Sequence, residues 1–314
     1  MYERILVPLD GSEFSERVLP VAERLARDMA LPIHLLHSIE PEHPSISQSL
    51  NERLYYIHSA HHRGMHARAY AEPVRARLME AGLSVNITIP QGDPGDVIVE
   101  EADREPGTLI TMSSHGRSGA SRWWTGSVAD RVLHKTASPL LMIRPGDRRG
   151  AAAEGKFGRI VVPVDGSEMA EQALDHASHL GKSMGLVVEL VRAIPSVEEY
   201  NSLARLGPAS LVSQAPSYAE YRAIVEGEAR DYLAELAGRL KGDGAHVDWR
   251  VLHGPAAAAI IDHSVASEDA LLVMTTHGRS GVARMVLGSV AERVVRQSGE
   301  PVLLIRAREG QGAQ

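Results

Sequence analysis

The chain has 314 residues, with 33 Lys and Arg against 40 Asp and Glu, a formal net charge of −7 and no cysteine. This length allows two domains of ordinary size, and 44% hydrophobic with 23% charged residues is a globular composition. The missing cysteine excludes disulfides, thiolate catalysis and cysteine-based zinc sites, and the acidic balance argues against a general nucleic-acid or anionic-membrane binder.

The first half alternates short apolar runs with helical patterns. The first residues enter an apolar run at once without signal-peptide anatomy, and no apolar stretch approaches the roughly 18 residues that span a bilayer, so we expect a cytoplasmic protein. Five strands are predicted at 5–8, 32–38, 85–89, 109–112 and 139–143. Ser12 is a good N-cap for the first helix. A long helix should end near Ala81, with a break or kink at Gly64 and Pro73.

The pattern restarts in the second half. Residues 160–168 (IVVPVDGSE) match residues 5–13 (ILVPLDGSE) at an offset of 155, whereas later motifs match at an offset of 162. The second copy therefore carries about seven extra residues, between its second and third strands. We predict domains at 1–145 and 158–307, a linker at 146–157 and a flexible tail at 308–314. Alternating strand and helix signals predict α/β domains with parallel strands and right-handed crossovers.

A glycine-rich loop joins the fourth strand to the next helix in each copy. It reads SSHGRSGASRWWTGSV at 113–128 and TTHGRSGVARMVLGSV at 275–290. Glycine lets backbone N–H groups approach a phosphate, and a helix N-terminus adds unpaired donors and the positive end of its dipole. The loop therefore predicts an anion-binding cradle in each copy. The alternative is a tight turn with a capping box, Ser127 with Asp130 and Ser289 with Glu292.

These motifs resemble the universal stress protein family in its tandem two-domain form. The resemblance rests on the VPxDGS opening, the HGRSG loop, the GSVA(D/E)RV helix start and the closing strands PLLMIR and PVLLIR, and it covers nearly the whole chain. It implies two tandem doubly wound α/β domains, each a five-stranded parallel sheet of order 3-2-1-4-5 flanked by helices. Nucleotide-binding members look like G-x-x-G, nine residues, then G-S/T. Here Gly116 and Gly126 enclose nine residues, as do Gly278 and Gly288, but Ser113 and Thr275 replace the first glycine.

The resemblance also implies ATP across the carboxyl ends of strands one and four, where the strand order reverses. In the first copy it implies the site residues Pro8, Leu9, Asp10, Ser38, Met112, Ser113, His115, Gly116, Arg117, Gly126, Ser127 and Val128. In the second copy it implies Pro163, Val164, Asp165, Ala193, Met274, Thr275, His277, Gly278, Arg279, Gly288, Ser289 and Val290. No residue is expected to be catalytic or to ligate a metal, and Mg²⁺ or Mn²⁺ would accompany the nucleotide on its phosphates.

Each role has a plainer alternative. The strand-end aspartates Asp10 and Asp165 would contact adenine or ribose, or would stabilise an Asx turn. Ser38 and Ala193 would border the base, or would simply pack in the core. The loop arginines would neutralise phosphate, or would be solvated. For the two loop histidines we favour an orienting hydrogen bond over phosphate contact or pH sensing.

Other motifs are weaker. His58, His62 and His66 share a helical spacing that could suit a metal, but the second copy has no such cluster, so we expect none there. The GKS at 181–183 lacks the glycine that a P-loop needs five positions earlier. Since no nucleophile, base and orienting group can be placed together, we expect binding rather than turnover.

These observations favour a stress-response protein that binds an adenine nucleotide and acts as a nucleotide-dependent regulator or sensor. The alternatives are a slow ATP hydrolase and a stress scaffold that binds no nucleotide. The fifth strands are sheet edges, and the resemblance implies that the two halves pair along them as an internal pseudo-dimer. We also expect a homodimer of chains. The sequence names no protein partner.

Overall fold

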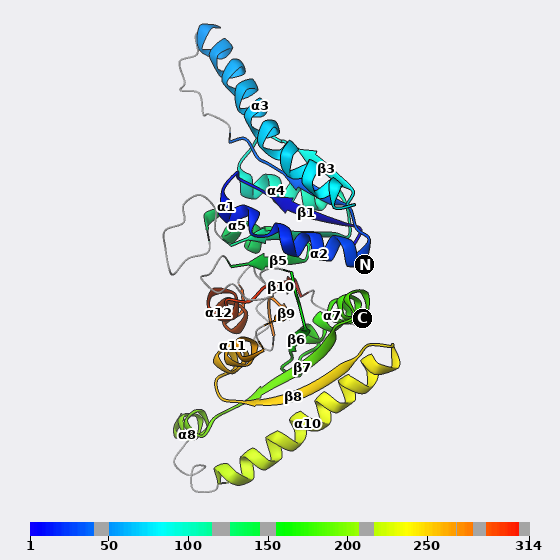
Figure 1. The fold of residues 1–314 in the computed structure, drawn as a ribbon. Coiled ribbons are helices and arrows are strands. Elements are labelled where there is room, and N and C mark those ends of the chain that lie inside the picture. Colours follow the sequence, from blue (N-terminus) through cyan, green and yellow to red (C-terminus); the bar gives the residue numbers. More distant parts are fainter. Residues whose placement is uncertain are drawn as a thin grey trace, which may run out of the picture. The chain divides into compact units, whose positions relative to one another are not determined.

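The computed structural model describes residues 1–40, 50–114, 126–144, 155–206, 217–267, 269–278 and 287–307, with the backbone alone at 50–61 and 203–206. The chain divides into two compact units, residues 1–149 with 153–156 and residues 150–152 with 157–314. Each unit is α/β, with helices packed on a parallel sheet (Figure 1). The α/β class and the tandem organisation agree with the expectation from the sequence.

The first unit has five parallel strands in the order β3-β2-β1-β4-β5, which is the expected order 3-2-1-4-5. Its elements are β1 (Arg4–Pro8), α1 (Glu13–Glu16), α2 (Leu19–Met29), β2 (Ile33–Leu36), α3 (Leu50–Glu80), β3 (Val85–Thr88), α4 (Pro94–Arg104), β4 (Thr108–Ser113), α5 (Ser127–Lys135) and β5 (Leu140–Ile143). The strand order reverses between β1 and β4, so their carboxyl ends form the switch point where open α/β sheets bind ligands.

The second unit repeats this topology in the order β8-β7-β6-β9-β10. Its elements are β6 (Arg159–Pro163), α6 (Glu168–Glu171), α7 (Ala173–Met184), β7 (Val187–Ile194), α8 (Val197–Leu206), α10 (Tyr218–Gly242), β8 (Val247–His253), α11 (Ala256–Ala266), β9 (Ala270–Thr275), α12 (Ser289–Gln297) and β10 (Val302–Ile305). Here the switch point lies between β6 and β9.

Apolar faces of helices and strands meet in the core of each unit. All six residues of β4 are buried, and so are all six of β9, as expected for central strands with helices on both faces. α2 buries one face at helical spacing, including Val21 and Leu25, and packs against β1. The first helix of each unit begins at a serine N-cap. Ser12 Oγ accepts the Ser15 N–H at 3.1 Å and Ser167 Oγ accepts the Ala170 N–H at 3.1 Å, which confirms the predicted cap at Ser12.

The strand registers locate the extra residues of the second copy. Ile33 on β2 and Val188 on β7 are equivalent and lie 155 residues apart. Val85 on β3 and Val247 on β8 are also equivalent, but they lie 162 residues apart. The insertion therefore falls between the second and third strands, as predicted, in the segment that contains α8.

α3 corrects one expectation from the sequence. It runs from Leu50 to Glu80 as a single helix with Pro73 inside it, so of the break or kink expected at Gly64 and Pro73, the break does not occur. Val74 and Leu78 are buried, and α3 packs against β3. This tertiary packing outweighs the local cost of a proline in a helix, which is about 3 kcal/mol.

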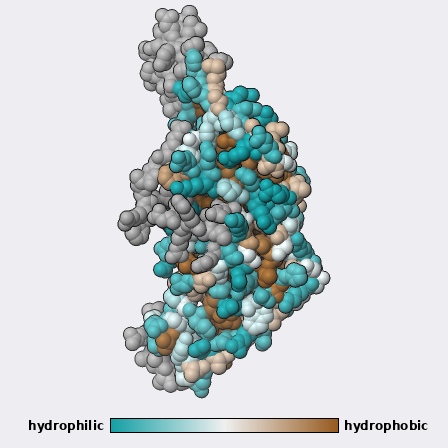
Figure 2. All heavy atoms as spheres, viewed as in Figure 1, coloured by the Kyte–Doolittle hydropathy of each residue, from teal (hydrophilic) through white to brown (hydrophobic). Residues whose placement is uncertain are grey.

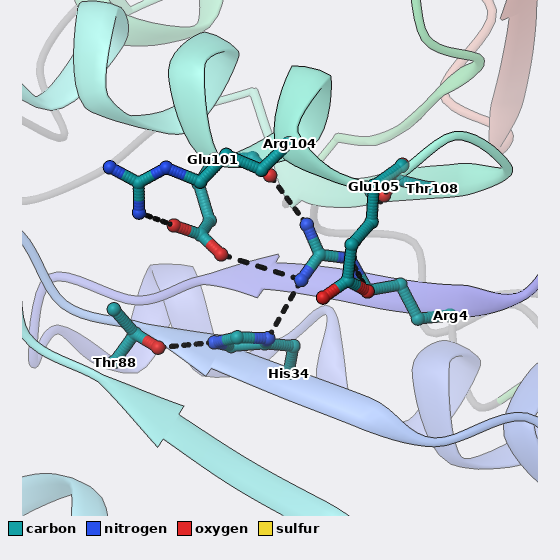
Figure 3. A network of polar contacts seen from close by, with 7 residues as sticks. All are labelled: Arg4, His34, Thr88, Glu101, Arg104, Glu105 and Thr108. Carbon is teal, nitrogen blue, oxygen red and sulfur yellow. Dashed lines mark hydrogen bonds and ion pairs between the residues drawn. The ribbon is translucent and has the colours of Figure 1, made fainter.

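A buried polar network ties β1, β2 and α4 together in the first unit (Figure 3). The Arg4 guanidinium donates to Glu101 Oε1 at 3.3 Å and to Thr108 Oγ1 at 2.9 Å. It also lies 3.0 Å from His34 Nδ1, and His34 Nε2 contacts Thr88 Oγ1. Because arginine can only donate, His34 Nδ1 is the acceptor and its proton is on Nε2. Burial, assisted by the charge of Arg4, lowers the pKa of His34 and keeps the ring neutral.

The second unit has a matching network centred on Glu189 of β7. The Glu189 carboxylate contacts Arg159 at 3.2 Å, Arg250 at 3.2 Å and His263 Nε2 at 3.0 Å. The glutamate side chain is buried, with 5% of its surface exposed. Three donors thus compensate the burial of one carboxylate.

Few large apolar side chains are exposed among the residues that the structure describes. On the face drawn in Figure 2, hydrophobic residues lie in separate groups among hydrophilic ones. Within the described ranges, the exposed large apolar side chains are those of Met1, Met65, Met79, Val187, Val197, Ile224 and Trp249. Among the helices that the structure describes, none combines the length and the apolar character needed to cross a membrane.

Candidate functional site

A cavity of about 730 Å³ lies at the switch point of the first unit. Its walls come from the ends of β1, β2 and β4 and from the start of α5. Of the predicted site residues, it brings together Pro8, Leu9, Asp10, Ser38, Met112, Ser113, Gly126, Ser127 and Val128. His115, Gly116 and Arg117 lie outside the described residues.

An equivalent cavity of about 270 Å³ lies at the switch point of the second unit. It brings together Pro163, Val164, Asp165, Ala193, Met274, Thr275, His277, Gly278, Gly288, Ser289 and Val290. Arg279 lies outside the described residues. In both units, therefore, every predicted site residue that the structure describes lines one cavity.

The helix that starts at each cavity begins with a glycine N-cap. Gly126 caps α5 and Gly288 caps α12, and neither cap has a side-chain hydrogen bond among the described residues. The alternative of a capping box at Ser127 or Ser289 is therefore wrong. The helix starts at the serine itself, so this residue is one position too far along the chain to cap it. The capping side chain that would compete with a phosphate for the first N–H groups of the helix is therefore absent among the described residues.

The two cap glycines do not offer their own amides. The Gly126 N–H donates to Ser114 O at 2.8 Å, and the Gly288 N–H donates to Thr276 O at 2.8 Å. The expected phosphate donors at this helix start are thereby narrowed to the N–H groups of Ser127 and Val128, with Ser289 and Val290 in the second unit. The resemblance also implied that Gly126 and Gly288 would donate their own N–H groups to phosphate; these hydrogen bonds correct that expectation, and the two glycines contribute space and turn geometry instead.

Close packing explains the glycines of the second cavity. A Cβ on Gly288 would lie 3.1 Å from Thr276 O, which is a backbone atom that cannot easily move. A Cβ on Gly278 would collide with the Asp165 carboxylate. The absence of side chains therefore keeps both the helix start and the strand-end aspartate accessible to the cavity.

The strand-end aspartates Asp10 and Asp165 form Asx turns, which were the alternative to ligand contact, and they also line the cavities. Asp10 Oδ1 accepts the Ser12 N–H at 2.9 Å and the Ser12 hydroxyl at 2.6 Å. Asp165 Oδ1 accepts the same pair of groups from Ser167, at 3.0 and 2.6 Å. These Asx turns hold each carboxylate at the mouth of its cavity, where it presents acceptor oxygens to a ligand.

The end of β9 shows what replaces the first glycine of the loop pattern. Thr275 Oγ1 donates to His277 O at 2.7 Å, and Thr276 Oγ1 lies 3.1 Å from His277 Nδ1. The threonines thus fix the backbone and the ring of His277, which supports the orienting role that we favoured. His277 Nε2 is buried and has no hydrogen-bond partner among the described residues.

Sequence reasoning missed a tyrosine that recurs in both units. The Tyr70 hydroxyl on α3 donates to Glu16 Oε1 at 2.9 Å, and the Tyr232 hydroxyl on α10 donates to Glu171 Oε1 at 3.0 Å. Burial raises the pKa of both phenols above the usual value, so both stay protonated. The signal was present in the repeat, because the tyrosines are separated by 162 residues and the glutamates by 155.

The partner of that tyrosine ring differs between the units. His37 lies against Tyr70, with ring centroids 5.7 Å apart, whereas the Arg192 guanidinium lies 5.1 Å from the centroid of the Tyr232 ring. His37 and Arg192 are equivalent positions just beyond β2 and within β7. Tyr70 and His37 line the first cavity, but neither counterpart is among the described residues that line the second.

Comparison with known proteins agrees with the fold and the repeat. The family model described as universal stress protein family matches residues 1–144 and 156–306. A universal stress protein of Mycolicibacterium smegmatis is 26% identical over 309 residues, which cover 97% of each chain. Another, of Methanocaldococcus jannaschii, is 28% identical over 153 residues, which cover 49% of this chain and 84% of its own.

Solved structures show the same architecture along the whole chain. The crystal structure of a universal stress protein from Archaeoglobus fulgidus matches with a TM-score of 0.66 at 21% identity, and covers 98% of this chain and 97% of that one. At this identity the likeness supports the fold alone. The two family-model matches, taken with the repeated sheet, show that the chain belongs to the universal stress protein family and carries two of its domains in tandem.

Proposed function

We propose that this stress-response protein binds an adenine nucleotide, ATP foremost, in one or both domains and acts as a nucleotide-dependent regulator. The observation that carries the proposal is the repeated helix start. α5 and α12 each begin at a glycine cap without a side-chain cap, and each faces a cavity at a switch point. Backbone N–H groups and the helix dipole at such a point favour phosphate.

The second cavity has two features that fit a phosphate-bearing ligand. His277 Nε2 is a buried polar atom with no partner among the described residues, and buried polar atoms of that kind normally make a hydrogen bond. Gly288 leaves open the space that a Cβ would close against Thr276 O. In this proposal Ser289 and Val290 donate their N–H groups to the phosphates and His277 turns its free nitrogen to the same ligand.

The remaining walls suit a nucleoside. Pro8, Leu9 and Met112 give the first cavity an apolar surface for a base, and Pro163, Val164 and Met274 do so in the second. The carboxylates of Asp10 and Asp165 would accept hydrogen bonds from a ribose hydroxyl or an exocyclic amine. Mg²⁺ or Mn²⁺ would be held by the phosphates, whose charge it would neutralise.

Two glycine variants test this arrangement. Gly126→Val should remove nucleotide binding from the first domain, and Gly288→Val from the second, each lowering the number of ATP molecules bound per chain. Gly227→Val is the matched control, because a Cβ on this glycine of α10 meets nothing within 4 Å. Titration calorimetry with MgATP on nucleotide-free protein measures the stoichiometry, and circular dichroism checks the fold.

The outcomes separate the rival functions. Unchanged affinity and stoichiometry in both variants would contradict the phosphate assignment. Folded wild-type protein that binds no nucleotide would favour a scaffold role instead. Release of inorganic phosphate from ATP, lost in both variants, would support slow hydrolysis in place of regulation by binding alone.

The expected homodimer of chains belongs to the same proposal. Light scattering on the full chain measures its mass with and without MgATP. A mass of two chains is the expected result, and a monomer at all concentrations would contradict it.

A further inference from the structure

The outer strand of the second sheet, β8, has an open edge. In the order β8-β7-β6-β9-β10 it pairs with β7 on one side, and no strand or isolated bridge that the structure describes pairs with it on the other. The helices α10 and α11 each pack on both β7 and β8, so they cover the faces of the sheet and not its end. Within the described ranges, the side of β8 away from β7 is therefore open to another strand.

Every second residue of β8 turns its backbone groups to this open edge. The Gly254 N–H donates to Ile194 O at 2.9 Å, so in the regular parallel ladder the even-numbered residues of β8 bond to β7. Val247, Trp249 and Val251 therefore direct their N–H and C=O groups away from β7, where no described group bonds to them. A row of unpaired backbone groups of this kind is a template for a strand of another chain.

The middle of β8 carries one exposed aromatic side chain between two exposed charges of opposite sign. Trp249 is 38% exposed. Asp248 and Arg250 flank it, are exposed as well, and point to the opposite face of the sheet. The Arg250 Nε donates to Glu189 Oε1 at 3.2 Å, which holds the guanidinium in place and leaves its terminal nitrogens as further donors.

The first domain protects the same edge. Its counterpart β3 has four residues, against seven in β8. At the offset of 162, Asn86 and Thr88 replace the two charged residues of β8, and Pro90 stands where β8 has Leu252. A short edge strand and a proline are common means of preventing a sheet from pairing with another chain. β8 is longer and contains no proline, so its edge lacks this protection.

Charge selects one register for two antiparallel copies of β8. A two-fold axis at Asp248 would place two carboxylates opposite each other, and an axis at Arg250 would place two guanidinium groups opposite each other. Like charges directly opposite destabilise a strand pair. An axis at Val247 or Val251 shortens the paired segment and separates the acid from the base. An axis at Trp249 places Asp248 opposite Arg250 of the second copy, once on each side of the axis.

The backbone agrees with this register. In it Trp249 lies opposite Trp249 of the second copy, and Val247 lies opposite Val251. Each of these residues has its N–H and C=O on the open edge, so each pair exchanges two hydrogen bonds. Asp248 and Arg250 then form the non-hydrogen-bonded pairs, whose Cα atoms are about 4.5 Å apart and whose side chains are closest. The pairing thus joins the two charges where they are nearest.

From these observations we infer that β8 pairs with β8 of a second copy of this chain, antiparallel and with the two-fold axis at Trp249. The second sheets of the two chains then form one continuous sheet. Backbone hydrogen bonds supply the contact, and the Asp248–Arg250 pairs together with Trp249 fix the partner and the register. This inference rests on the homodimer proposed above and specifies its interface.

Sedimentation of the full chain over a range of concentrations tests the inference. The wild-type chain should sediment with the mass of two chains. Trp249→Lys places two lysines opposite each other and removes the aromatic contact, so it should raise the dissociation constant of the dimer about tenfold or more. Val187→Lys is the matched control, because Val187 on β7 is 37% exposed and lies outside the open edge; it should leave the constant unchanged.

Asp248→Arg tests the register. It brings an arginine opposite Arg250 on each side of the axis and should weaken the dimer about tenfold, whereas Asp248→Glu keeps the charge and should keep the dimer. Asp243→Arg makes the same change of charge at an exposed position before β8 and should leave the dimer intact. Circular dichroism shows whether each variant is folded.

A disulfide test is specific because the natural chain contains no cysteine. In Trp249→Cys the two introduced thiols meet at the axis, where the Cα atoms of a hydrogen-bonded pair are about 5.5 Å apart, a distance that a disulfide spans. Mild oxidation should give a covalent dimer on a non-reducing gel. Val187→Cys is the control and should remain a single chain under the same oxidation.

The failures are distinguishable. If the wild-type chain is a dimer and neither Trp249→Lys nor Asp248→Arg weakens it, the inference is overturned and the homodimer stands with another interface. Equal covalent dimer from the two cysteine variants also overturns the inference. A folded wild-type chain that is monomeric at all concentrations would show that both the homodimer and its interface are wrong, while nucleotide binding is tested separately by the MgATP titrations.

Discussion

Glu189 on β7 takes the position in the second sheet that His34 takes on β2 in the first. The helices show the reverse exchange, because Glu101 on α4 is equivalent to His263 on α11. Acid and imidazole have thus exchanged places while an arginine at the start of the first strand is kept. Either change alone would have gathered two carboxylates or two imidazoles in one buried cluster, at a cost in electrostatic free energy. Together they keep each domain's buried charges balanced.

Glu189 should make the stability of the second domain depend on acid pH. The hydrogen bond with His263 holds the pKa of Glu189 at about 2, below the usual 4.5, although burial acts to raise it. A carboxyl whose folded-state pKa is depressed stabilises the domain above its unfolded pKa, and this contribution is lost as pH falls from about 4.5 to about 2. Glu189→Gln should destabilise the domain at pH 6 and flatten the loss of stability over that acid range.

Trp249 on β8 can report on the second domain alone. The chain has three tryptophans, so Trp123→Phe with Trp124→Phe leaves Trp249 as the single fluorophore. Urea unfolding followed by its fluorescence, at several pH values, measures the effect. Glu235→Gln, at an exposed position on α10, is the control. If the unfolding free energy of Glu189→Gln falls with acid pH as steeply as that of Glu235→Gln, the role assigned to Glu189 is contradicted.

Arg4 should be costly to remove. Its side chain is 4% exposed and that of Glu101 7%, so Arg4→Ala leaves a buried carboxylate with less compensation. We expect the first domain to lose about 3–5 kcal/mol of unfolding free energy. Arg75→Ala breaks a pair whose side chains are 36% and 47% exposed, and should cost at most about 1 kcal/mol. Urea denaturation compares the two, and equal costs would show that the buried network does not stabilise the domain.

The strands were predictable because each is a short apolar run that appears twice, and the repeat located the insertion between the second and third strands. The sheet order came from the family resemblance, since no local pattern specifies which strands pair. The capping box was the wrong reading because Gly126 bonds to Ser114 O and caps the helix one residue earlier. This hydrogen bond joins Gly126 to Ser114, twelve positions earlier and just after β4, so it depends on the folded chain and not on the local sequence.

The site was partly predictable for the same reason. Asp10 and Ser127 belong to motifs that recur in sequence, and they do line one cavity. Arg63 and His66 belong to no repeated motif, and from the sequence we named only His66, in a metal site that we did not expect. Only the packing of α3 beside the end of β2 brings them to the cavity. Tyr70 could have been found from its counterpart Tyr232 at the repeat offset.

Pro73 offers a stabilising substitution. It is exposed in the interior of α3, where a proline has no N–H for the helical hydrogen bond to the residue four positions earlier. Pro73→Ala should raise the unfolding free energy of the first domain by about 1–3 kcal/mol. Urea denaturation measures this gain. A loss of stability would mean that the surrounding packing requires the proline geometry.

Tyr232 and Glu171 should be energetically coupled. Tyr232→Phe removes the hydroxyl that donates to Glu171 at 3.0 Å and should destabilise the second domain by about 1.5 kcal/mol. A double-mutant cycle with Glu171→Gln, followed by Trp249 fluorescence, isolates the pair from the Arg239 contact of the same carboxylate. Strictly additive effects would show that the hydrogen bond contributes nothing to stability.

Nucleotide occupancy of the intact chain tests the central claim most directly. Native mass spectrometry of nucleotide-free protein, titrated with MgATP, counts the ATP molecules held by each folded chain. The two helix starts that lack a side-chain cap predict a chain with one or two ATP molecules bound and no third specific site. A folded chain that holds no ATP over the whole titration would contradict the nucleotide-binding account.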